Sequence, residues 1–245
     1  MKETVLLLIK FFDKEEYADA FINIGEMLCR TLQEFKCMYD EERGDKYEGV
    51  WACFQPDKIK VTLMAENKNV ISEDVLVDGI VSPVVLQDNS CDDFNIYCMY
   101  AVKIEEFSES YETEHEKQVI VEKLNSIIKE KCLLSEELLR FGKFAVVIFK
   151  VGEFVEKLNA FLDKMNFEHW NGLVGYYNPN EFNGVFDGIE SVFRKRDIYK
   201  HQNEYRFLFN SKNTARIIRI GSLEDMAFKI STERINQTLR LELNT

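Results

Sequence analysis

The stretch Phe193–Phe209, with the sequence FRKRDIYKHQNEYRFLF, passes from a basic segment into an apolar one. Tyr205, Phe207 and Phe209 lie two positions apart, which is the spacing of side chains that share one face of a β-strand. Aromatic residues at this spacing predict that this face packs in a core. The stretch therefore predicts a late strand at residues 203–209 with one buried side.

The opposite face of this predicted strand carries polar side chains. Gln202, Glu204 and Arg206 lie two positions apart, so all three point the same way. An arginine beside a carboxylate keeps that carboxylate ionised. Such a pair also occurs as a solvated ion pair on an exposed strand, where it is worth under about 1 kcal/mol. The pattern by itself leaves both interpretations open.

The rest of the chain alternates between short apolar runs and amphipathic segments. Strands are predicted at residues 5–12, 27–32, 58–63, 75–86, 94–104, 143–151, 173–177, 203–209, 215–220 and 238–243. Helices are predicted at 17–24 with Gly25 as C-terminal cap, at 33–43, at 113–128 behind a Thr113–Glu116 capping box, at 153–165, and at 225–230 behind Ser222. Helices separate the early strands while the later strands crowd together, and this order predicts an α+β fold of mixed or antiparallel β-sheets with flanking helices. We expect residues 1–245 to form a single domain.

Composition and motifs exclude several kinds of site. Neither Gly-x-Gly-x-x-Gly nor Gly-Lys-Ser/Thr occurs, so we expect no Rossmann or P-loop nucleotide site. The six cysteines and three histidines show no paired metal-ligand spacing, and we expect no metal site. No apolar run approaches the roughly 20 residues that cross a bilayer. We therefore expect a soluble, cytoplasmic protein with no membrane partner.

Charge is distributed unevenly along the chain. The formal net charge is -12, and an acidic surface disfavours passive binding to nucleic acids. The window Glu190–Arg219 reverses this balance, with eight basic residues against three acidic ones. Such a window indicates either a local anion site or a solvated face that glutamates from elsewhere in the chain balance.

The order of its elements makes the chain resemble a broad bacterial and phage family of unknown function. Members begin with a strand and a helix, continue with an Asp-Pro-x-Glu-like element, and carry a Lys, a Glu-x-Glu and an Arg near the end. The corresponding pieces here are Asp45-Lys-Tyr-Glu48-Gly49, Ile96-Tyr-Cys98, the strand from Gly142 to Phe149, Val174-Gly-Tyr-Tyr177, and Lys195 with Gln202-Asn-Glu204-Tyr-Arg206. The resemblance covers about residues 5–210 and implies that Lys195 and Arg206 bind substrate.

The Gln-x-Glu arrangement also resembles the signature of ADP-ribosyltransferases. That resemblance implies an ADP-ribosyltransferase-like fold that uses NAD as a substrate. It makes Glu204 the catalytic residue, which stabilises the positive charge that develops as nicotinamide leaves. It makes Gln202 the residue that orients the acceptor.

An early strand of such a fold supplies the residues that hold NAD. The resemblance implies Arg30 with Thr31 for this role, or else Lys10 at the end of the first strand. Tyr47 flanks the loop that contains Asp45, and it either stacks on the nicotinamide ring or packs against a neighbouring helix.

Together these resemblances predict an NAD-dependent ADP-ribosyltransferase-like effector, a toxin of a toxin–antitoxin or anti-phage defence system. Its acceptor is RNA or DNA if the basic patch at 194–219 borders the cleft, and a protein otherwise. A cognate antitoxin or a chaperone would restrain it. The alternative is a non-catalytic binding or sensor module on the same scaffold. A third interpretation is a nuclease in which Asp45 and Glu48 hold Mg²⁺ and Lys60 lies nearby.

Overall fold

The computed structural model describes residues 3–39, 44–63, 75–77, 79–105, 110, 112–212 and 216–239. The chain forms two compact units, each assembled from separate stretches of sequence. Unit 1 contains Met1–Thr31, Asp93–Val174 and His201–Thr245, and unit 2 contains Leu32–Asp92 and Gly175–Lys200. The single domain expected over residues 1–245 stays a prediction.

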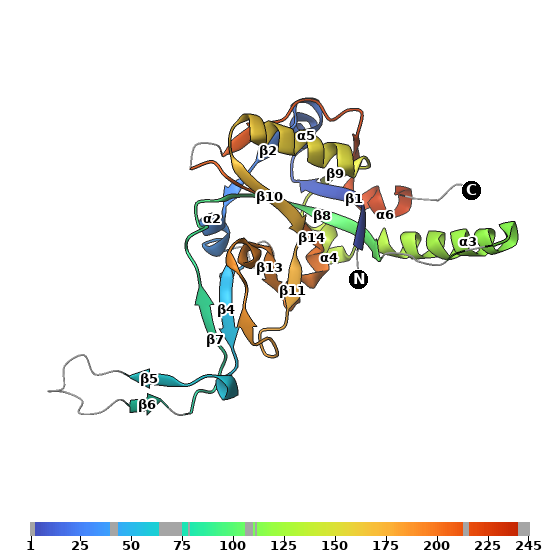
Figure 1. Cartoon of the computed structure of the whole chain (residues 1–245). Helices are drawn as coiled ribbons and strands as arrows, with labels where there is room; N and C mark the ends of the chain where they lie inside the picture. Colours follow the sequence, from blue (N-terminus) through green and yellow to red (C-terminus); the bar gives the residue numbers. More distant parts are fainter. Residues whose placement is uncertain are drawn as a thin grey trace. The chain divides into compact units, whose positions relative to one another are not determined.

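Unit 1 is organised by a seven-stranded antiparallel β-sheet (Figure 1). Its strands are β1 (Glu3–Phe12), β3 (Arg30–Thr31), β8 (Asn95–Glu105), β9 (Phe144–Ile148), β10 (Glu168–Leu173), β14 (Glu204–Asn210) and β16 (Ala227–Ser231). The strand order is β10–β14–β8–β1–β9–β16. β8 pairs with β14 along one edge and with both β1 and β3 along the other. A separate antiparallel pair joins β2 (Glu26–Leu28) to β15 (Ile217–Arg219).

Helices of unit 1 contribute to a core on each face of this sheet. They are α1 (Glu15–Ile24), α3 (Glu114–Lys131), α4 (Glu136–Leu139), α5 (Val151–Lys164) and α6 (Ile235–Thr238). One core packs Phe21 of α1 and Phe154 of α5 with Phe207 of β14. The other contains Ile128 of α3 and Val147 of β9. These antiparallel strands with flanking helices confirm the predicted α+β class.

Two helix ends follow the capping rules that the sequence predicts. α1 ends at Gly25, whose φ of 63° lies in the left-handed region and whose N–H donates to the Phe21 carbonyl at 3.0 Å. α3 begins behind Thr113, whose side chain accepts the Glu116 N–H while the Glu116 carboxylate accepts the Thr113 N–H. No helix among the described residues is long and apolar enough to span a bilayer.

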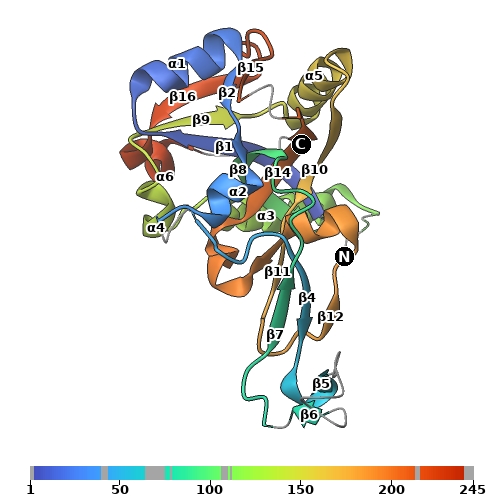
Figure 2. The same cartoon turned by 90° about the vertical axis from the view of Figure 1, so that its left-hand side faces the viewer.

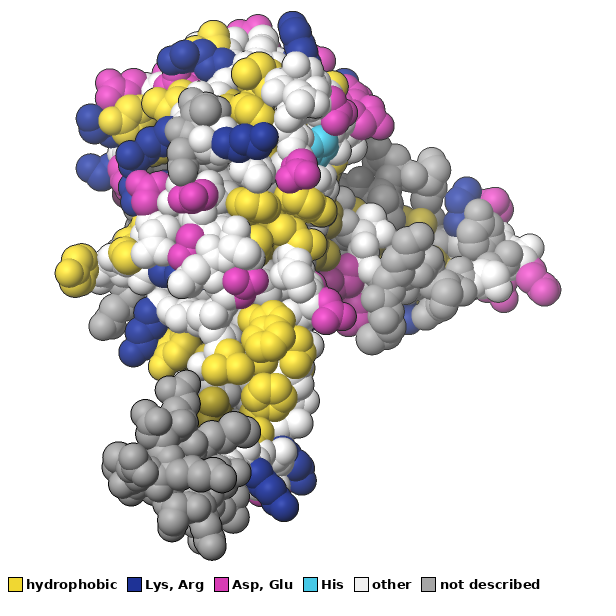
Figure 3. Space-filling model, turned by 60° about the vertical axis from the view of Figure 1, so that its left-hand side comes forward, with side chains coloured by type: hydrophobic (Ala, Val, Ile, Leu, Met, Phe, Trp, Pro, Cys, Tyr) yellow, Lys and Arg dark blue, Asp and Glu magenta, His cyan; other side chains and the backbone are white. Residues whose placement is uncertain are grey.

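Unit 2 consists of small sheets and short helices. Its elements are α2 (Leu32–Lys36), β4 (Val50–Phe54), η1 (Pro56–Lys58), β5 (Val61–Leu63), β6 (Val75–Val77), β7 (Val84–Gln87), β11 (Gly175–Tyr177), β12 (Gly184–Val185), η2 (Gly188–Phe193) and β13 (Arg194–Arg196). Strands β12, β4 and β7 form one sheet, and Figure 2 shows the β5–β6 hairpin continuing beyond β4 and β7. Trp51, Leu86 and Val185 are exposed on the first sheet, and Figure 3 shows apolar side chains gathered on this part of the surface.

The predicted helix at 225–230 is wrong, because Ala227–Ser231 form strand β16. β16 pairs with β9, whose backbone groups on that edge would otherwise lack partners. Ser222 does accept a backbone N–H, from Glu224 at 3.3 Å, but in a turn rather than at a helix end. The pairing of β16 with β9 joins segments far apart in the sequence, so the local sequence pattern does not predict it.

Several predicted elements have other bounds. The predicted strand at 27–32 is divided at Cys29 into β2 and β3, and Leu32 already begins α2. α2 is only five residues long, and residues 40–43 of the predicted helix lie outside the described ones. The predicted strand at 173–177 is interrupted at Val174. Residues 240–243 of the last predicted strand also lie outside the described ones, and Thr238 ends α6.

The spacing of Tyr17, Ala20, Phe21 and Ile24 predicts that these side chains form the buried face of α1, but the buried face is rotated from this one. Ala18 and Phe21 are fully buried, whereas Tyr17 and Ile24 are exposed. Apolar residues occur at helical spacing on both of these faces of α1. Packing against the sheet buries the face with Ala18, whose side chain is smaller than that of Tyr17.

Replacing Gly25 by alanine should lower the free energy of unfolding. The left-handed backbone alone costs a non-glycine residue about 1–2 kcal/mol. In addition, a Cβ at this position would lie 2.5 Å from both the Gly221 carbonyl oxygen and Ile220 Cγ1. Urea unfolding of Gly25→Ala measures the loss. The matched control is Gly152→Ala in α5, where a Cβ meets nothing within 4 Å and stability should be kept or rise. Equal stability of the two variants would contradict this account.

Candidate functional site

Unit 2 contains a group of four charged side chains, three of them buried and one, Arg196, partly exposed. We call this group the ion-pair cluster: Asp45, Glu48, Lys195 and Arg196. Asp45 accepts a hydrogen bond from Arg196 Nη2 at 2.6 Å. Lys195 Nζ lies 3.4 Å from Glu48 Oε1. The exposed fraction of Asp45 and Glu48 is 1% each, and that of Lys195 is 3%. The structure thus brings together two parts of the sequence that the family resemblance singles out, the 45–49 loop and Lys195.

Aromatic rings surround the cations of the ion-pair cluster. The Arg196 guanidinium lies 4.4 Å from the centre of the Tyr47 ring, and the Tyr47 N–H donates to Asp45 Oδ1 at 2.9 Å. Tyr199 donates its hydroxyl proton to the Gly44 carbonyl at 3.1 Å. Burial lowers the pKa of Arg196, but its hydrogen bond and charge attraction to Asp45, together with smaller effects of Tyr199, outweigh burial and the pKa is raised. Tyr47, expected either to stack on nicotinamide or to pack against a helix, lies against Arg196.

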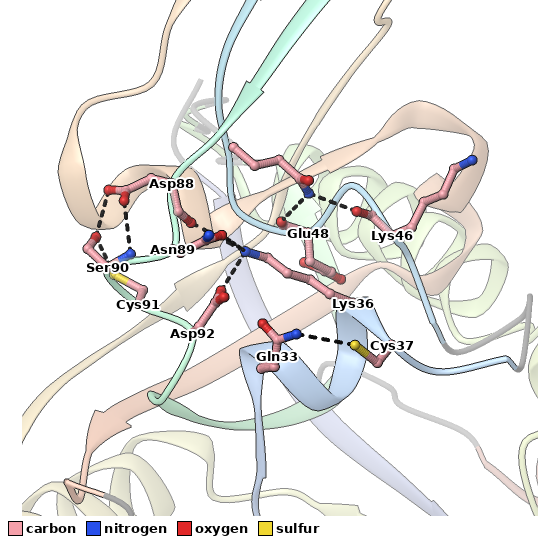
Figure 4. Close-up of polar contacts among 11 residues, drawn as sticks. Gln33, Lys36, Cys37, Lys46, Glu48, Asp88, Asn89, Ser90, Cys91 and Asp92 are labelled. Carbon is pink, nitrogen blue, oxygen red and sulfur yellow. Dashed lines mark hydrogen bonds and ion pairs between the residues drawn. The ribbon is translucent and has the colours of Figure 1, made fainter.

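Hydrogen bonds from β7 hold the loop that carries Glu48, and hydrogen bonds from α2 hold the neighbouring 88–92 segment (Figure 4). Gln87 Nε2 donates to the Lys46 carbonyl at 2.7 Å and to the Glu48 carbonyl at 3.1 Å. Lys36 of α2 donates to Asp92 and, at 3.3 Å, to the carbonyl oxygen of Asp88. The two Gln87 bonds fix the backbone of the Glu48 loop by contacts within unit 2.

The carboxylates proposed for a nuclease face basic side chains. Asp45 pairs with Arg196 and Glu48 with Lys195, and each cation competes with a metal ion for the same oxygens. Among the described residues, no three His, Cys, Asp or Glu side chains form a group that could hold a metal. Lys60 is an exposed residue between η1 and β5. The arrangement therefore does not favour the nuclease.

The basic window is largely paired with carboxylates. The pairs are Arg194–Glu190, Lys195–Glu48, Arg196–Asp45, Arg206–Glu204 and Arg219–Glu26. Lys200 and Lys212 are exposed. The sequence left open a local anion site or charge balance by acidic residues. These five basic side chains fit the second interpretation, because each is paired with a carboxylate.

Unit 1 places Glu204 and Arg206 at the start of β14. Arg206 Nε donates to Glu204 Oε1 at 2.6 Å. The exposed fraction is 6% for Glu204 and 2% for Arg206, so the pair is not the solvated surface pair that the sequence left open. The expected shared face is confirmed by the register, in which Glu204 lies opposite Tyr100 and Arg206 opposite Cys98 of β8.

Gln202 does not lie on this strand, contrary to the sequence prediction. It ends the 3₁₀ helix η3 (Asp197–Gln202), and β14 begins only at Glu204. Between them Asn203 has a φ of 39°, which interrupts the strand alternation. The Asn203 side chain donates to the Ala101 carbonyl at 2.6 Å and thereby fixes this turn. Gln202 is buried, with 7% of its surface exposed.

Cys98 of β8 lies next to the Glu204 carboxylate and forms a side-chain hydrogen bond with it. Burial and the negative charge of Glu204 raise the pKa of the Cys98 thiol well above its usual value, so the thiol stays protonated. Sequence analysis did not identify Cys98 as a site residue, because only the pairing of β8 with β14 brings it there.

Lys10 lies on the other face of the sheet from Glu204. Its Nζ donates to the Cys98 carbonyl at 2.7 Å and lies 4.3 Å from the centre of the Tyr97 ring. Tyr97 is opposite Phe207 and belongs to the core that α1 and α5 cover. The structure thus does not bring Lys10 together with Glu204.

Arg30 shares the face of Glu204, but at a distance. Arg30 lies opposite Ile96 and Glu204 opposite Tyr100, on the two edges of β8. Four residues along the strand and two strand spacings separate their Cα atoms by about 16 Å. Thr31 follows Arg30 in the strand and points to the opposite face.

Comparison of the chain with protein-family models, with curated proteins and with solved structures finds no match. The family resemblance and the ADP-ribosyltransferase-like fold therefore stay predictions. The assignment of function depends on the geometry described above.

Removing one partner of the Glu48–Lys195 pair should destabilise the protein strongly. Leaving a buried charge without its partner costs about 3–5 kcal/mol. Urea unfolding of Lys195→Met, Glu48→Gln and the double variant should show that the double variant loses less than the sum of the single ones. Lys200→Met, at an exposed lysine five residues along, serves as the control. Strictly additive losses would show that the two side chains do not interact.

Proposed function

We propose that the chain is an NAD-dependent ADP-ribosyltransferase-like effector of a toxin–antitoxin or anti-phage defence system, with Glu204 as its catalytic residue. The buried Glu204–Arg206 pair at the start of β14 is the observation that supports this proposal most. Arg206 and Cys98 hold the carboxylate in one orientation before any ligand binds. A carboxylate that is already oriented and desolvated stabilises a developing positive charge without reorganisation.

The proposed reaction breaks the bond between the nicotinamide nitrogen and C1′ of the attached ribose. Nicotinamide leaves with the bonding electron pair, and a nucleophile of the acceptor forms a new bond to C1′ and loses its proton. Positive charge develops on the ribose during this exchange, and Glu204 stabilises it because their attraction is strong in a site of low dielectric. We propose that Gln202, which is also buried and ends η3 just before β14, orients the acceptor through its amide.

Arg30 is proposed to hold the pyrophosphate of NAD. Its guanidinium suits bidentate binding of phosphate oxygens, and it shares the sheet face of Glu204. Thr31 and Lys10 point to the opposite face, so this proposal leaves the role to Arg30. Tyr47 is in unit 2, and its binding of nicotinamide stays a prediction.

The ion pairs favour a protein acceptor over RNA or DNA. Lys195 and Arg196 are paired with carboxylates inside unit 2, so their charge is already balanced. A nucleic acid needs several unbalanced cations along its phosphates. A binding site for substrate at Lys195 or Arg206, and an RNA or DNA acceptor on the 194–219 patch, stay predictions. Restraint by an antitoxin or chaperone also stays a prediction.

Glu204→Gln should lower NAD turnover by about 100-fold or more, because loss of one such charge-stabilising group typically has this effect. Glutamine keeps the size of the side chain and an oxygen that accepts from Arg206 Nε. Nicotinamide release from labelled NAD and transfer of label to lysate proteins measure the activity. The matched control is Glu168→Gln, at an exposed glutamate on β10 of the same sheet.

The outcomes of this assay separate the candidate functions. Loss of turnover in a folded Glu204→Gln protein, with normal turnover in Glu168→Gln, supports the transferase. A wild-type protein that binds NAD in calorimetry but releases no nicotinamide is instead the binding or sensor module. A folded Glu204→Gln protein that turns over NAD as fast as the wild type contradicts the assignment of Glu204.

A further inference from the structure

A strip of the unit 1 sheet lies beside Glu204, and the strand register defines its members. On β10, Trp170 is opposite Leu208 and Gly172 is opposite Arg206. Residues paired across neighbouring strands point to the same face, and Arg206 shares its face with Glu204. Trp170 and Gly172 therefore project from the sheet on the side of Glu204.

Gly172 occupies the interior of a strand although its own conformation does not require glycine. Its φ is not in the left-handed region, and a Cβ at this position would meet no atom within 4 Å. At Gly142, by contrast, a Cβ would lie 2.6 Å from the backbone of Phe12. Glycine weakens a strand, and it often marks a place where another group closely approaches the backbone. At Gly172 that space is open.

An aromatic pair, Trp170 and Phe94, lies beside the open space at Gly172. Trp170 is half-buried and stacks on Phe94, with ring centres 5.9 Å apart and ring planes inclined by 14°. Trp170 lies two residues from Gly172 on the same face, so their Cα atoms are about 7 Å apart. The open space at Gly172 thus has the aromatic side chain of Trp170 at its edge.

The strip lies within reach of a ligand at the carboxylate. Gly172 and Glu204 are on neighbouring strands and two residues apart in register, so their Cα atoms are separated by about 8 Å. A ribose at Glu204 can therefore carry a ring that lies over Gly172.

We propose that Gly172 and Trp170 form a subsite for a planar heteroaromatic ring of the ligand that binds at Glu204. The ring lies on the backbone of Gly172 and against the side chain of Trp170, where stacking on an aromatic side chain favours any flat ring. That this ring belongs to NAD rests on the proposed function. Nicotinamide and adenine share the required chemistry, and the experiment distinguishes them.

Tryptophan fluorescence tests the subsite without turnover. The chain has two tryptophans, so Trp51→Phe leaves Trp170 as its single tryptophan. Titration of this protein with NAD, nicotinamide and adenosine monophosphate should give saturable quenching, and the fragment that quenches identifies the ring. Adding Gly172→Val should weaken binding of NAD at least tenfold, because the valine side chain occupies the space that the ring would take. The Tm should stay equal or rise, because the added side chain meets no neighbouring atom.

Two further variants complete the test. Gly172→Ala adds a single methyl group and replaces the valine variant if that protein does not fold. Gly152 is the other glycine of unit 1 at which an added Cβ meets no atom within 4 Å, so Gly152→Ala should bind NAD as tightly as the parent does. Equal NAD affinity in the folded Gly172 variants and the parent overturns the subsite, even if the enzyme turns over NAD. Saturable quenching that Gly172→Val abolishes supports the subsite even if no turnover occurs, and in that case only the transferase proposal fails.

Discussion

The backbone ladder on the two edges of β8 is the constraint on which unit 1 depends. β14 pairs along one edge, and β1 and β3 pair along the other. This register sets the direction of every side chain near the candidate site. It puts Cys98 beside Arg206 and turns Lys10 to the opposite face. A slip of one residue would send Glu204 into the apolar core and Phe207 to the polar face.

Both units contain a buried ion pair, Glu204–Arg206 in unit 1 and Glu48–Lys195 in unit 2. Desolvation of two charges costs several kcal/mol per ion, and well-packed apolar side chains often give equal or greater stability. Stability alone therefore does not explain these pairs. In unit 2 the pair fixes the loop before β4, which is a structural role. In unit 1 it holds a carboxylate on a sheet face that has open space at Gly172, and this arrangement favours a chemical role.

The sequence predicts the elements whose determinants are local and fails where pairing partners are distant. The Gly25 cap and the Thr113–Glu116 box are properties of neighbouring residues, and both are confirmed. Ala227–Ser231 became a strand because β9 offers an open edge, which no local pattern reveals. The turn at Asn203 depends likewise on a hydrogen bond to Ala101, more than one hundred positions earlier. For the same reason the shared face of Glu204 and Arg206 could be predicted but their burial could not.

The distribution of charged residues along the sequence does not show which of them are paired in the folded chain. Arg196 lies in the most basic window of the chain, yet its partner Asp45 is 151 positions earlier, so the charge of Arg196 is balanced by a residue far away in the sequence. A ligand phosphate is attracted by a cation that is near the reacting groups and on the same face, whatever the balance of its neighbours in sequence. Arg30 meets the second condition and lies outside the window. In an acidic protein such as this one, anion binding is therefore better sought along the sheet face that carries Glu204 than in the basic segment itself.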